Sequence, residues 1–253
     1  MSTAPSPESL PDLVRRTRTD LAAAFRLAAK LDMNEGVDNH FTARVPGTTD
    51  RFFINPKQLH WSEIRASDVL VVDPVGRVVE PSPYTPPRSG VAIHLPIHQA
   101  HPRGGCVFHL HMPWSTALTC AKGGRLEMVH QNSARFYEDA ACDEEYNSVA
   151  LDQGEGRRMA RVLGDKTVLF LTNHGVIVVT ETIAEAFDDL YYLERASQVQ
   201  VLAMSTGQPL NVMPEALALR TKADFGNYKM GASLHFEALK RIHLDRAGAD
   251  YTA

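Results

Sequence analysis

The chain has 253 residues, of which 44% are hydrophobic and 22% are charged. These are ordinary values for a globular protein, and they exclude a disordered or fibrous chain. With 26 basic and 30 acidic residues, the formal net charge of -4 gives no general attraction to nucleic acid or to an anionic membrane. Any anionic ligand must therefore meet local basic groups.

The cysteines and the ends of the chain indicate its compartment and its domain organisation. Cys106, Cys120 and Cys142 form no CxxC pair and are odd in number, which argues against a disulfide framework and fits a reducing environment. No segment has the pattern of a signal peptide or of a membrane span. We expect a cytoplasmic protein with a flexible lead over residues 1–12 and a single domain over residues 13–253 that ends in a helical tail.

The first part of the chain alternates between helical and strand patterns. Apolar residues at helical spacing predict a helix over residues 13–31. Runs of β-branched and aromatic residues predict strands over 36–45 and 51–56. Two similar runs flank the sequence DPVG, which predicts a hairpin over residues 69–81.

Two shorter helices are expected in the middle of the chain. The first covers residues 89–102, with Ser89 as its N-cap. Pro96 lies inside this segment and predicts either a kink or a later start of the helix. The second covers residues 152–164 and ends at Gly164.

Two later segments complete the pattern of elements. The sequence TVLFLTNHGVIVVT, residues 167–180, predicts two strands that meet at TNHG. Residues 182–207 form the longest helical pattern. The residues near one face of that helix are Ala186, Leu190, Leu193 and Ser197. Together the elements predict a mixed sheet with helices packed on it, of class α/β or α+β, without an internal repeat.

Two histidines stand out in the apolar segment CVFHLH, residues 106–111. If this segment is a strand, His109 and His111 share one face, and their Cα atoms lie about 6.6 Å apart. Both rings can then bind one metal ion at about 2 Å. An isolated pair of this kind more commonly faces water or is satisfied by hydrogen bonds, so a metal site needs a further ligand.

A third histidine supplies that ligand. His174 lies between two apolar runs, at a turn where Gly175 permits a positive φ. Three neutral histidines that bind zinc, iron(II) or manganese and leave open positions are a common catalytic arrangement. Because the chain contains 11 histidines, spacing alone leaves coincidence as an equal alternative.

At this point the sequence resembles the class II aldolase/adducin family, over roughly residues 13–205. DNHFTARVP resembles the family's early Asn-bearing strand, HPRGGCVFHLHMPWSTAL its HxH strand, and TVLFLTNHGVIVV its NHG segment. The helical segment ETIAEAFDDLYYLERASQVQ resembles the long helix that follows.

The resemblance implies a fold, a metal and an assembly. The expected fold is three-layer α/β, with a central, mostly antiparallel sheet flanked by helices. His109, His111 and His174 become ligands of a divalent metal ion, either zinc or manganese, with iron(II) as an alternative. The expected assembly is a homotetramer with active sites between subunits.

The sequence departs from the aldolases of this family at two places. The aldolases carry a catalytic glutamate four residues before a histidine; here that histidine is His94, and Gly90 stands at the glutamate position. The small residues of their phosphate loop correspond to INPKQLHW, residues 54–61, so a backbone cradle for phosphate is not expected.

Basic side chains in the same regions suggest another kind of substrate. Lys57 and Arg88 suit a carboxylate, which favours a carboxylated substrate without phosphate. The equal alternative is that both are solvated surface cations. Asn39 and Ser89 complete the expected substrate-binding set, and no nucleic acid or membrane partner is expected.

The remaining histidines include the expected proton donor. We expect His94 to face the pocket and His98 to pack or to lie at an interface, rather than to form a second metal site. His40, His60 and His130 can donate a proton if the fold brings them to the metal, although each on its own is more commonly structural. The expected catalytic residues are His94, His40 and His130.

These features favour a metal-dependent carbon–carbon lyase, and within that class a decarboxylase of a hydroxylated aromatic or oxo carboxylic acid. The metal would bind a substrate oxygen together with the carboxylate and stabilise the enolate-like carbanion. Decarboxylation needs no base to remove a carbon-bound proton, so the missing glutamate matters less than in an aldolase.

Three alternatives remain open at this point. One is an aldolase or epimerase that acts on an unphosphorylated substrate. Another is an iron(II) oxygenase that carries out an oxidative decarboxylation. The last is a non-enzymatic, adducin-like interaction domain, which is disfavoured because the chain keeps all three histidines and lacks a long basic tail.

Overall fold

The chain is organised around one mixed β-sheet. The computed structural model describes residues 8–226 and 230–253, and within them seven strands form this sheet. The strands are β1 (His40–Arg44), β2 (Phe52–Ile54), β3 (Leu70–Val72), β4 (Cys106–Leu110), β5 (Ala140–Asp143), β6 (Val168–Leu171) and β7 (Gly175–Thr180). Their order is β3-β2-β1-β4-β7-β6-β5, and only β5 and β6 pair in parallel. The expected mostly antiparallel sheet is confirmed.

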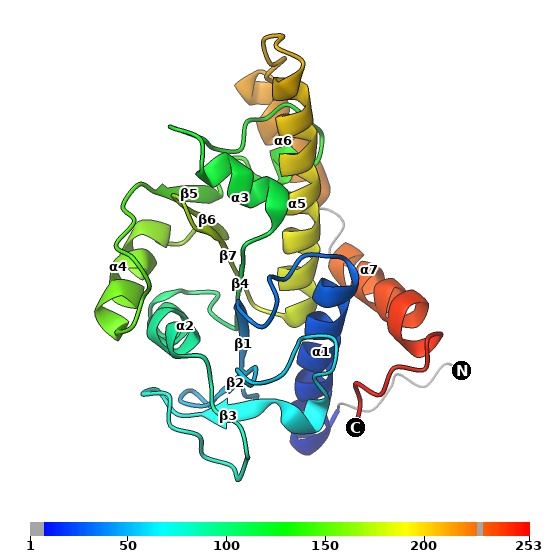
Figure 1. Ribbon diagram of the computed structural model, residues 1–253. Helices are drawn as coiled ribbons and strands as arrows, with labels where there is room; N and C mark the ends of the chain where they lie inside the picture. Colours follow the sequence, from blue (N-terminus) through cyan, green and yellow to red (C-terminus); the bar gives the residue numbers. More distant parts are fainter. Residues whose placement is uncertain (1–7, 227–229) are drawn as a thin grey trace.

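Helices cover both faces of the sheet. The helices are α1 (Leu10–Lys30), α2 (Arg88–Ala100), α3 (Pro113–Thr119), α4 (Gln153–Leu163), α5 (Ile183–Ser205), α6 (Glu215–Gly226) and α7 (Gly231–Lys240). Short turns of other helical types are η1 (Ala66–Asp68), η2 (Ser133–Phe136) and η3 (Arg241–Asp245). In Figure 1, α2 and α4 lie on one side of the sheet, and α1 and α5 lie on the other. This is the expected three-layer α/β fold.

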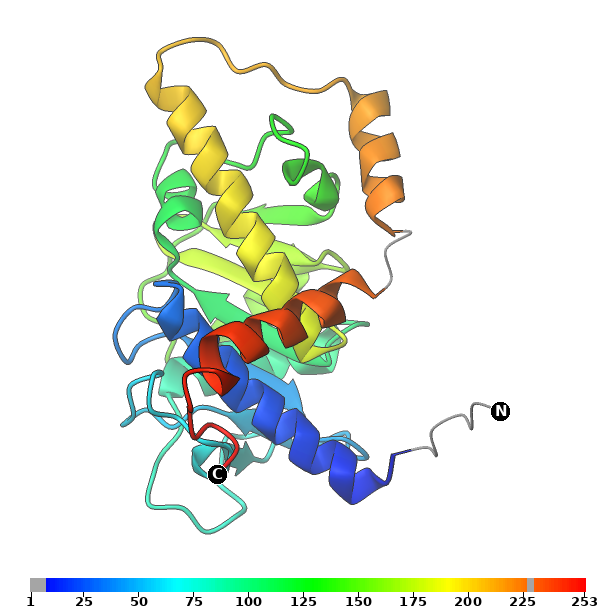
Figure 2. The same cartoon turned by 90° about the vertical axis from the view of Figure 1, so that its right-hand side faces the viewer.

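The last two helices form the helical tail of the chain. Figure 2 shows α7 lying across α5 and α1, while α6 stands beside the upper part of the sheet. Lys240 at the end of α7 pairs with Asp20 of α1, with 2.8 Å between Nζ and Oδ1. In residues 8–226 and 230–253, no helix combines the length and apolarity required to cross a bilayer.

The two faces of the central strands carry different chemistry because side chains alternate along a strand. Phe41 and Phe108 face the layer of α1 and α5, where their rings stack with centroids 3.8 Å apart. His40, Thr42 and His109 occupy the alternate positions of β1 and β4 and face the layer of α2 and α4. The apolar face therefore anchors the strands, and the opposite face holds buried polar groups.

Helix α1 begins earlier than the sequence pattern indicates. Ser9 is its N-cap and accepts a hydrogen bond from the backbone N–H of Asp12, so the helix starts at Leu10 rather than at residue 13. The lead expected over residues 1–12 is thus shortened at its end, and residues 1–7 lie outside the described part.

Pro96 does not delay the start of α2, which begins at Arg88 and continues through the proline. Proline has no N–H to bond to the Ala92 carbonyl one turn earlier. Gly156 of α4 packs directly against that carbonyl, where a Cβ would overlap it. The pair of Pro96 and Gly156 therefore allows α2 and α4 to approach closely. The expected cap is also corrected: Pro87, not Ser89, precedes the first helical residue.

The hairpin expected over residues 69–81 forms only in part. Asp73 uses a side-chain oxygen to accept the N–H groups of Val75 and Arg77, and this holds the expected turn. Beyond the turn, the returning segment makes one isolated bridge, between Val72 and Val78. The prediction of a second regular strand in this hairpin is therefore wrong.

We predict that Phe108→Ala lowers the free energy of unfolding by about 3–5 kcal/mol, because it removes a fully buried ring and leaves a cavity beneath the central strands. Urea denaturation monitored by circular dichroism measures this loss. Leu219→Ala, on an exposed part of α6, is the control and should change stability by less than about 0.5 kcal/mol. A loss below about 1 kcal/mol at Phe108 would contradict the role given to this stack.

Candidate active site

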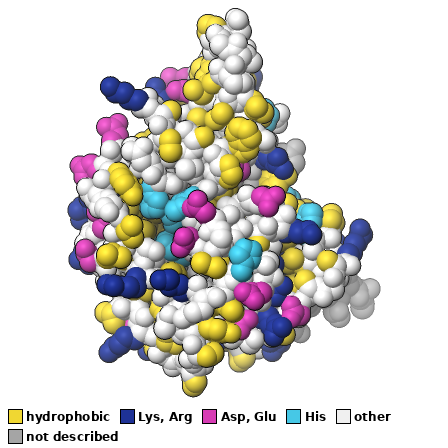
Figure 3. All heavy atoms as spheres, in the orientation of Figure 1, with side chains coloured by type: hydrophobic (Ala, Val, Ile, Leu, Met, Phe, Trp, Pro, Cys, Tyr) yellow, Lys and Arg dark blue, Asp and Glu magenta, His cyan; other side chains and the backbone are white. Residues whose placement is uncertain are grey.

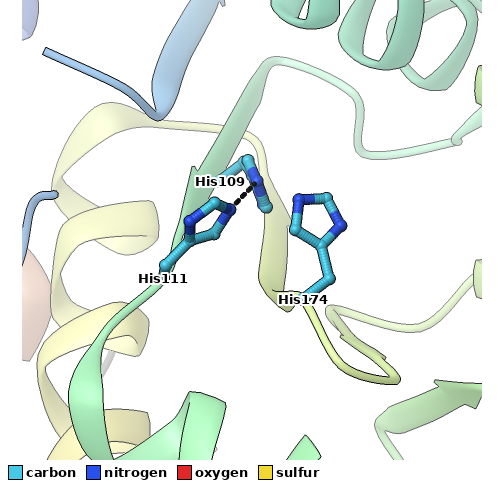
Figure 4. A group of neighbouring side chains, drawn as sticks. All are labelled: His109, His111 and His174. Carbon is cyan, nitrogen blue, oxygen red and sulfur yellow. Dashed lines mark hydrogen bonds between the residues drawn. The ribbon is translucent and has the colours of Figure 1, made fainter. Parts of the chain in front are cut away.

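Three histidines converge at one end of the central strands. His109 lies on β4, His111 follows the end of β4, and His174 lies in the turn between β6 and β7. Since β4 and β7 are antiparallel neighbours, the turn that begins β7 lies beside the end of β4. One ring nitrogen from each histidine lies within 4.8 Å of those from the other two. Figure 4 shows the three rings turned toward one another.

The close approach of this turn depends on Gly175 in a way that differs from our expectation. The positive φ of the turn belongs to Asn173, at 56°, and not to Gly175. A Cβ on Gly175 would lie 2.5 Å from the Leu110 carbonyl oxygen and 2.8 Å from Cδ2 of His111. Gly175 is therefore required for space, because a larger residue would push His174 away from the other two rings.

The hydrogen bonds of His109 and His111 leave both Nε2 atoms without a proton. His109 Nδ1 donates to the Val176 carbonyl at 2.9 Å, and His111 Nδ1 donates to the Glu35 carboxylate at 2.6 Å. In the neutral rings, the two Nε2 lone pairs then face each other across 3.0 Å. This arrangement fits a shared cation, since histidine nitrogens bind zinc at about 2.0–2.1 Å.

Burial keeps His109 and His174 neutral. Burial and the neighbouring histidines lower the pKa of His109 well below 6.5. Burial, followed by the electrostatic effect of the neighbouring His111, lowers the pKa of His174 to about 4. Neutral imidazoles are the form that binds a metal ion. The three nitrogen donors therefore fit the zinc, manganese or iron(II) that the sequence indicates.

A cavity of about 510 Å³ opens in front of the three histidines. Its lining includes the four expected substrate-binding residues, Asn39, Lys57, Arg88 and Ser89. Lys57 and Arg88 are exposed, and within the described residues neither forms an ion pair. In Figure 3, histidine side chains gather on the near face of the molecule, with Lys and Arg side chains below them.

Asn39 contributes to the cavity through its backbone shape as well as its side chain. It has a positive φ of 73°, which asparagine tolerates better than most residues. Its Oδ1 accepts the N–H of Glu35 at 3.1 Å, and this fixes the loop that carries the partner of His111. Its Nδ2 is buried without a hydrogen-bond partner among the described residues, so this amide can still donate.

A chain of buried hydrogen bonds lies behind the cavity wall. His40 Nε2 lies 3.1 Å from Ser89 Oγ, and His40 Nδ1 lies 2.8 Å from His94 Nε2. Thr42 Oγ1 then lies 2.8 Å from His94 Nδ1 and 2.7 Å from His98 Nε2. Burial lowers the pKa of all three histidines, and that of His98 falls to about 3.

The structure separates the three histidines expected to be catalytic. His40 lines the cavity, and its ring centroid lies 4.9 Å from that of His109. His94 is fully buried and reaches the cavity only through His40. His130 is not among the residues that line the cavity in the described part of the chain. Exposed His60 bonds to Ser62 and is likewise outside the lining.

Gly90 explains why His40 lies where it does. A Cβ at position 90 would lie 3.0 Å from Cγ of His40 and 3.1 Å from Cδ1 of Ile54. The missing side chain therefore makes room for the imidazole. Position 90, where the resemblance predicts the aldolase glutamate, is therefore packed against by a histidine from β1.

Sequence reasoning missed three residues at this site. Thr42 shares a strand face with His40, and the strand period could have revealed it. Glu35 lies in a turn whose distance from His111 in the sequence gave no signal. Tyr146 lies in the segment after β5, and its ring centroid lies 6.1 Å from that of His174, a proximity that no local pattern indicated.

The fold and the three-histidine centre define a domain of the class II aldolase type. A family model described as Class II Aldolase and Adducin N-terminal domain matches residues 19–201. The chain belongs to this family.

Similar proteins cover almost the whole chain. A Caulobacter vibrioides protein that carries an aldolase class 2 name is 35% identical over 213 residues, which are 83% of this chain and 82% of that protein. The crystal structure of an aldolase II superfamily protein from Pseudomonas syringae is 34% identical, with a TM-score of 0.88 over 95% of this chain and 96% of that chain. L-fuculose 1-phosphate aldolase from Glaciozyma antarctica is 27% identical, with a TM-score of 0.85 over 98% and 96%.

We predict that Glu35→Gln weakens zinc binding about 10–100-fold, because it removes the negative charge that orients His111 and increases the basicity of its ring. Competition with a chromogenic chelator measures the Kd. The matched control is Glu237→Gln on α7, whose carboxylate pairs with Lys240 and should leave the Kd unchanged. An unchanged Kd in Glu35→Gln would show that the carboxylate does not support the metal ligand.

The buried histidines also predict a loss of stability in acid. His98 has a folded pKa of about 3, against 6.5 for the free side chain. Between these values the unfolded chain binds a proton that the folded chain does not. The free energy of unfolding therefore falls as pH falls from 6.5 toward 3, by at most about 1.4 kcal/mol per pH unit for each such histidine.

Urea denaturation of the metal-free protein at pH 7, 6 and 5 measures this slope. His98→Gln should make the slope shallower, because it removes one of the protons taken up on unfolding. His60→Gln replaces an exposed histidine and is the matched control for the chemical change. Equal slopes in wild type and His98→Gln would contradict a neutral, buried His98.

Proposed function

We propose that the protein is a divalent-metal-dependent carbon–carbon lyase, and more specifically a decarboxylase of a hydroxylated aromatic or oxo carboxylic acid. One observation carries the proposal: a single cavity combines three metal-ligating histidines with two unpaired cations, while Gly90 leaves the aldolase glutamate position without a carboxylate. A bound divalent ion supplies Lewis acidity toward a substrate oxygen. His109, His111 and His174 would hold it.

The cations of the cavity support a carboxylated substrate. Arg88 begins α2 and Lys57 follows β2, so they reach the cavity from different elements. A guanidinium binds a carboxylate through two parallel hydrogen bonds, and Lys57 adds a point charge. Neither residue has a competing acidic partner in residues 8–226 and 230–253, so both are available to the ligand.

His40 and Ser89 support the proton transfer that decarboxylation requires. When the bond to the carboxylate breaks, carbon dioxide leaves, the electron pair stays on the substrate carbon, and one proton from solvent must reach that carbon. His40 Nε2 lies 3.1 Å from Ser89 Oγ at the cavity wall, where it can take up this proton from solvent and then pass it to the carbon. Asp38 and Tyr146 also line the cavity and are the competing donors.

Aldol cleavage is the second candidate function. The likeness to L-fuculose 1-phosphate aldolase extends over 98% of this chain, which favours it at the level of the fold. The exchange of glutamate for Gly90 disfavours it, because aldol chemistry needs a base at a carbon-bound or hydroxyl proton. On this reading His40 takes the role of that base, and the substrate carries no phosphate.

The assembly and the metal complete the proposal. We place the active enzyme in the cytoplasm as a homotetramer whose subunits close the cavity from its open side. Zinc or manganese suits the lyase, whereas iron(II) would support an oxidative decarboxylation, since zinc has no redox chemistry. An adducin-like binding module is the account that remains if no metal binds.

The function is tested by metal analysis and product analysis on the same preparations. Purified protein should contain nearly one zinc or manganese ion per chain, and His109→Ala and His174→Ala should lose it. Metal-loaded wild type should release carbon dioxide from members of a panel of hydroxylated aromatic and oxo carboxylic acids. Aldehyde products without carbon dioxide would establish the aldolase, stoichiometric iron the oxygenase, and no metal after reconstitution the binding module.

We further predict that Arg88→Leu lowers kcat/KM for a carboxylate substrate about 10–100-fold, mainly through KM, because a charge-assisted contact of about 1.5–3 kcal/mol is lost. Arg125→Leu, whose partner is Glu127 outside the cavity, is the matched control. An unchanged KM in Arg88→Leu would contradict the contact between Arg88 and the substrate.

A comparison of His40→Gln with Asp38→Asn identifies the residue that delivers the proton. The variant with the larger loss in kcat marks the residue with this role.

A further inference from the structure

We propose that Thr42 and His98 are positioning residues that fix His40 in one tautomer, with its proton on Nδ1 and the lone pair of Nε2 at the cavity wall. The catalytic meaning of this arrangement rests on the proposed function. The tautomer itself does not, because it follows from a directional chain of hydrogen bonds between the Gly104 carbonyl and Ser89.

The direction of donation is set at the end of this hydrogen-bond network that lies farthest from the cavity, at Gly104. His98 Nδ1 lies 2.8 Å from the carbonyl oxygen of Gly104. A carbonyl oxygen only accepts, so Nδ1 must carry the proton. Arg44 donates to the same oxygen at 3.1 Å and cannot replace this contact. In neutral His98 the other nitrogen, Nε2, is therefore an acceptor.

Thr42 transmits this direction to His94 because its hydroxyl has a single proton to donate. Its Oγ1 lies 2.7 Å from His98 Nε2, which needs a donor. The competing acceptor is the Val107 carbonyl, at the longer distance of 3.2 Å. Once the hydroxyl donates to His98, Thr42 can only accept from His94, whose Nδ1 lies 2.8 Å away. His94 therefore carries its proton on Nδ1.

The same reasoning reaches His40 in one more step. Neutral His94 has its lone pair on Nε2, which lies 2.8 Å from His40 Nδ1, so His40 donates through Nδ1. Its Nε2 is then an acceptor beside the Ser89 hydroxyl at 3.1 Å. Each bond in the chain has one permitted direction, and all of them run from the cavity to Gly104.

The opposite direction is excluded by burial. If His40 carried its proton on Nε2, His94 would have to donate to it, and the Thr42 hydroxyl would have to donate to His94. His98 Nε2 would then either face Thr42 Oγ1 with no proton between them, or carry the proton itself. In the second case His98 Nδ1 and the Gly104 carbonyl oxygen would face each other with no proton between them. Thr42 and His94 have no exposed surface and His98 is 1% exposed, so water cannot compensate for the lost bond. The Nδ1–H tautomer of His40 is therefore the one that satisfies every group.

The arrangement explains how an imidazole can act where the aldolases use a carboxylate. A carboxylate presents an acceptor oxygen in either orientation, but a neutral imidazole presents an acceptor at only one nitrogen. The chain makes that nitrogen the one beside Ser89, at the cavity. Gly90 supplies the space for the ring, and Thr42 with His98 supplies its orientation.

Nuclear magnetic resonance of protein labelled with ¹⁵N-histidine tests this inference, since ring nitrogens that carry a proton differ in shift and coupling from those that do not. Metal-free and zinc-loaded wild type should both show the Nδ1–H pattern for His40, His94 and His98, assigned with single His→Gln variants. Thr42→Val should lose the single-tautomer pattern of His40, because either direction between His94 and His40 then becomes possible. Thr42→Ser should restore it.

Ser89→Ala is the control for direction. It removes the hydroxyl at the cavity end, and the His40 pattern should remain Nδ1–H because the direction is set at Gly104. An Nε2–H signal for His40 in wild type overturns the inference even if Thr42→Val does not fold. A pattern unchanged in folded Thr42→Val also overturns it. Absence of lyase activity with the expected tautomers would instead refute the proposed function alone.

Discussion

The antiparallel pairing of β1, β4 and β7 is the constraint on which the site depends. Its register places His40 opposite His109 and His109 opposite Ile177, so the rings of His40 and His109 are neighbours before any side-chain interaction forms. The same pairing brings the turn before β7 against the end of β4, where His174 meets His111. Backbone hydrogen bonds thus determine the spacing of these histidines, and side chains refine their orientation.

The two faces of these strands have different roles: one stabilises the fold, and the other holds the polar groups of the site. On one face, Phe41 and Phe108 stack against each other and the aromatic packing continues to Trp61. Such burial stabilises the strands enough to tolerate several polar side chains on the other face. There Thr42 and His98 are almost without exposed surface, and each polar atom of these two side chains has a hydrogen-bond partner. Neutral, fully paired imidazoles cost far less to bury than charged ones.

The sequence indicated the cluster of three histidines and the fold, but not the contacts that orient these rings. HxH on a strand and NHG at a turn follow from local periodicity, and the family motifs placed Lys57, Arg88 and Asn39 at the cavity. Local patterns could not show that Glu35 reaches His111, 76 positions away, because this contact depends on how the loop after α1 folds over β4. For the same reason His94 was expected at the cavity wall, whereas His40 stands between it and the cavity.

Position 90 and the ring of His40 share one small volume, and this limits how the site can be redesigned. A Cβ at position 90 would lie 3.0 Å from Cγ of His40, so the ring would have to shift to accept it. A glutamate introduced at position 90 would therefore meet the imidazole before it met a substrate. An engineered carboxylate at this position is expected to need a smaller residue at position 40 as well, so the two positions have to be changed together.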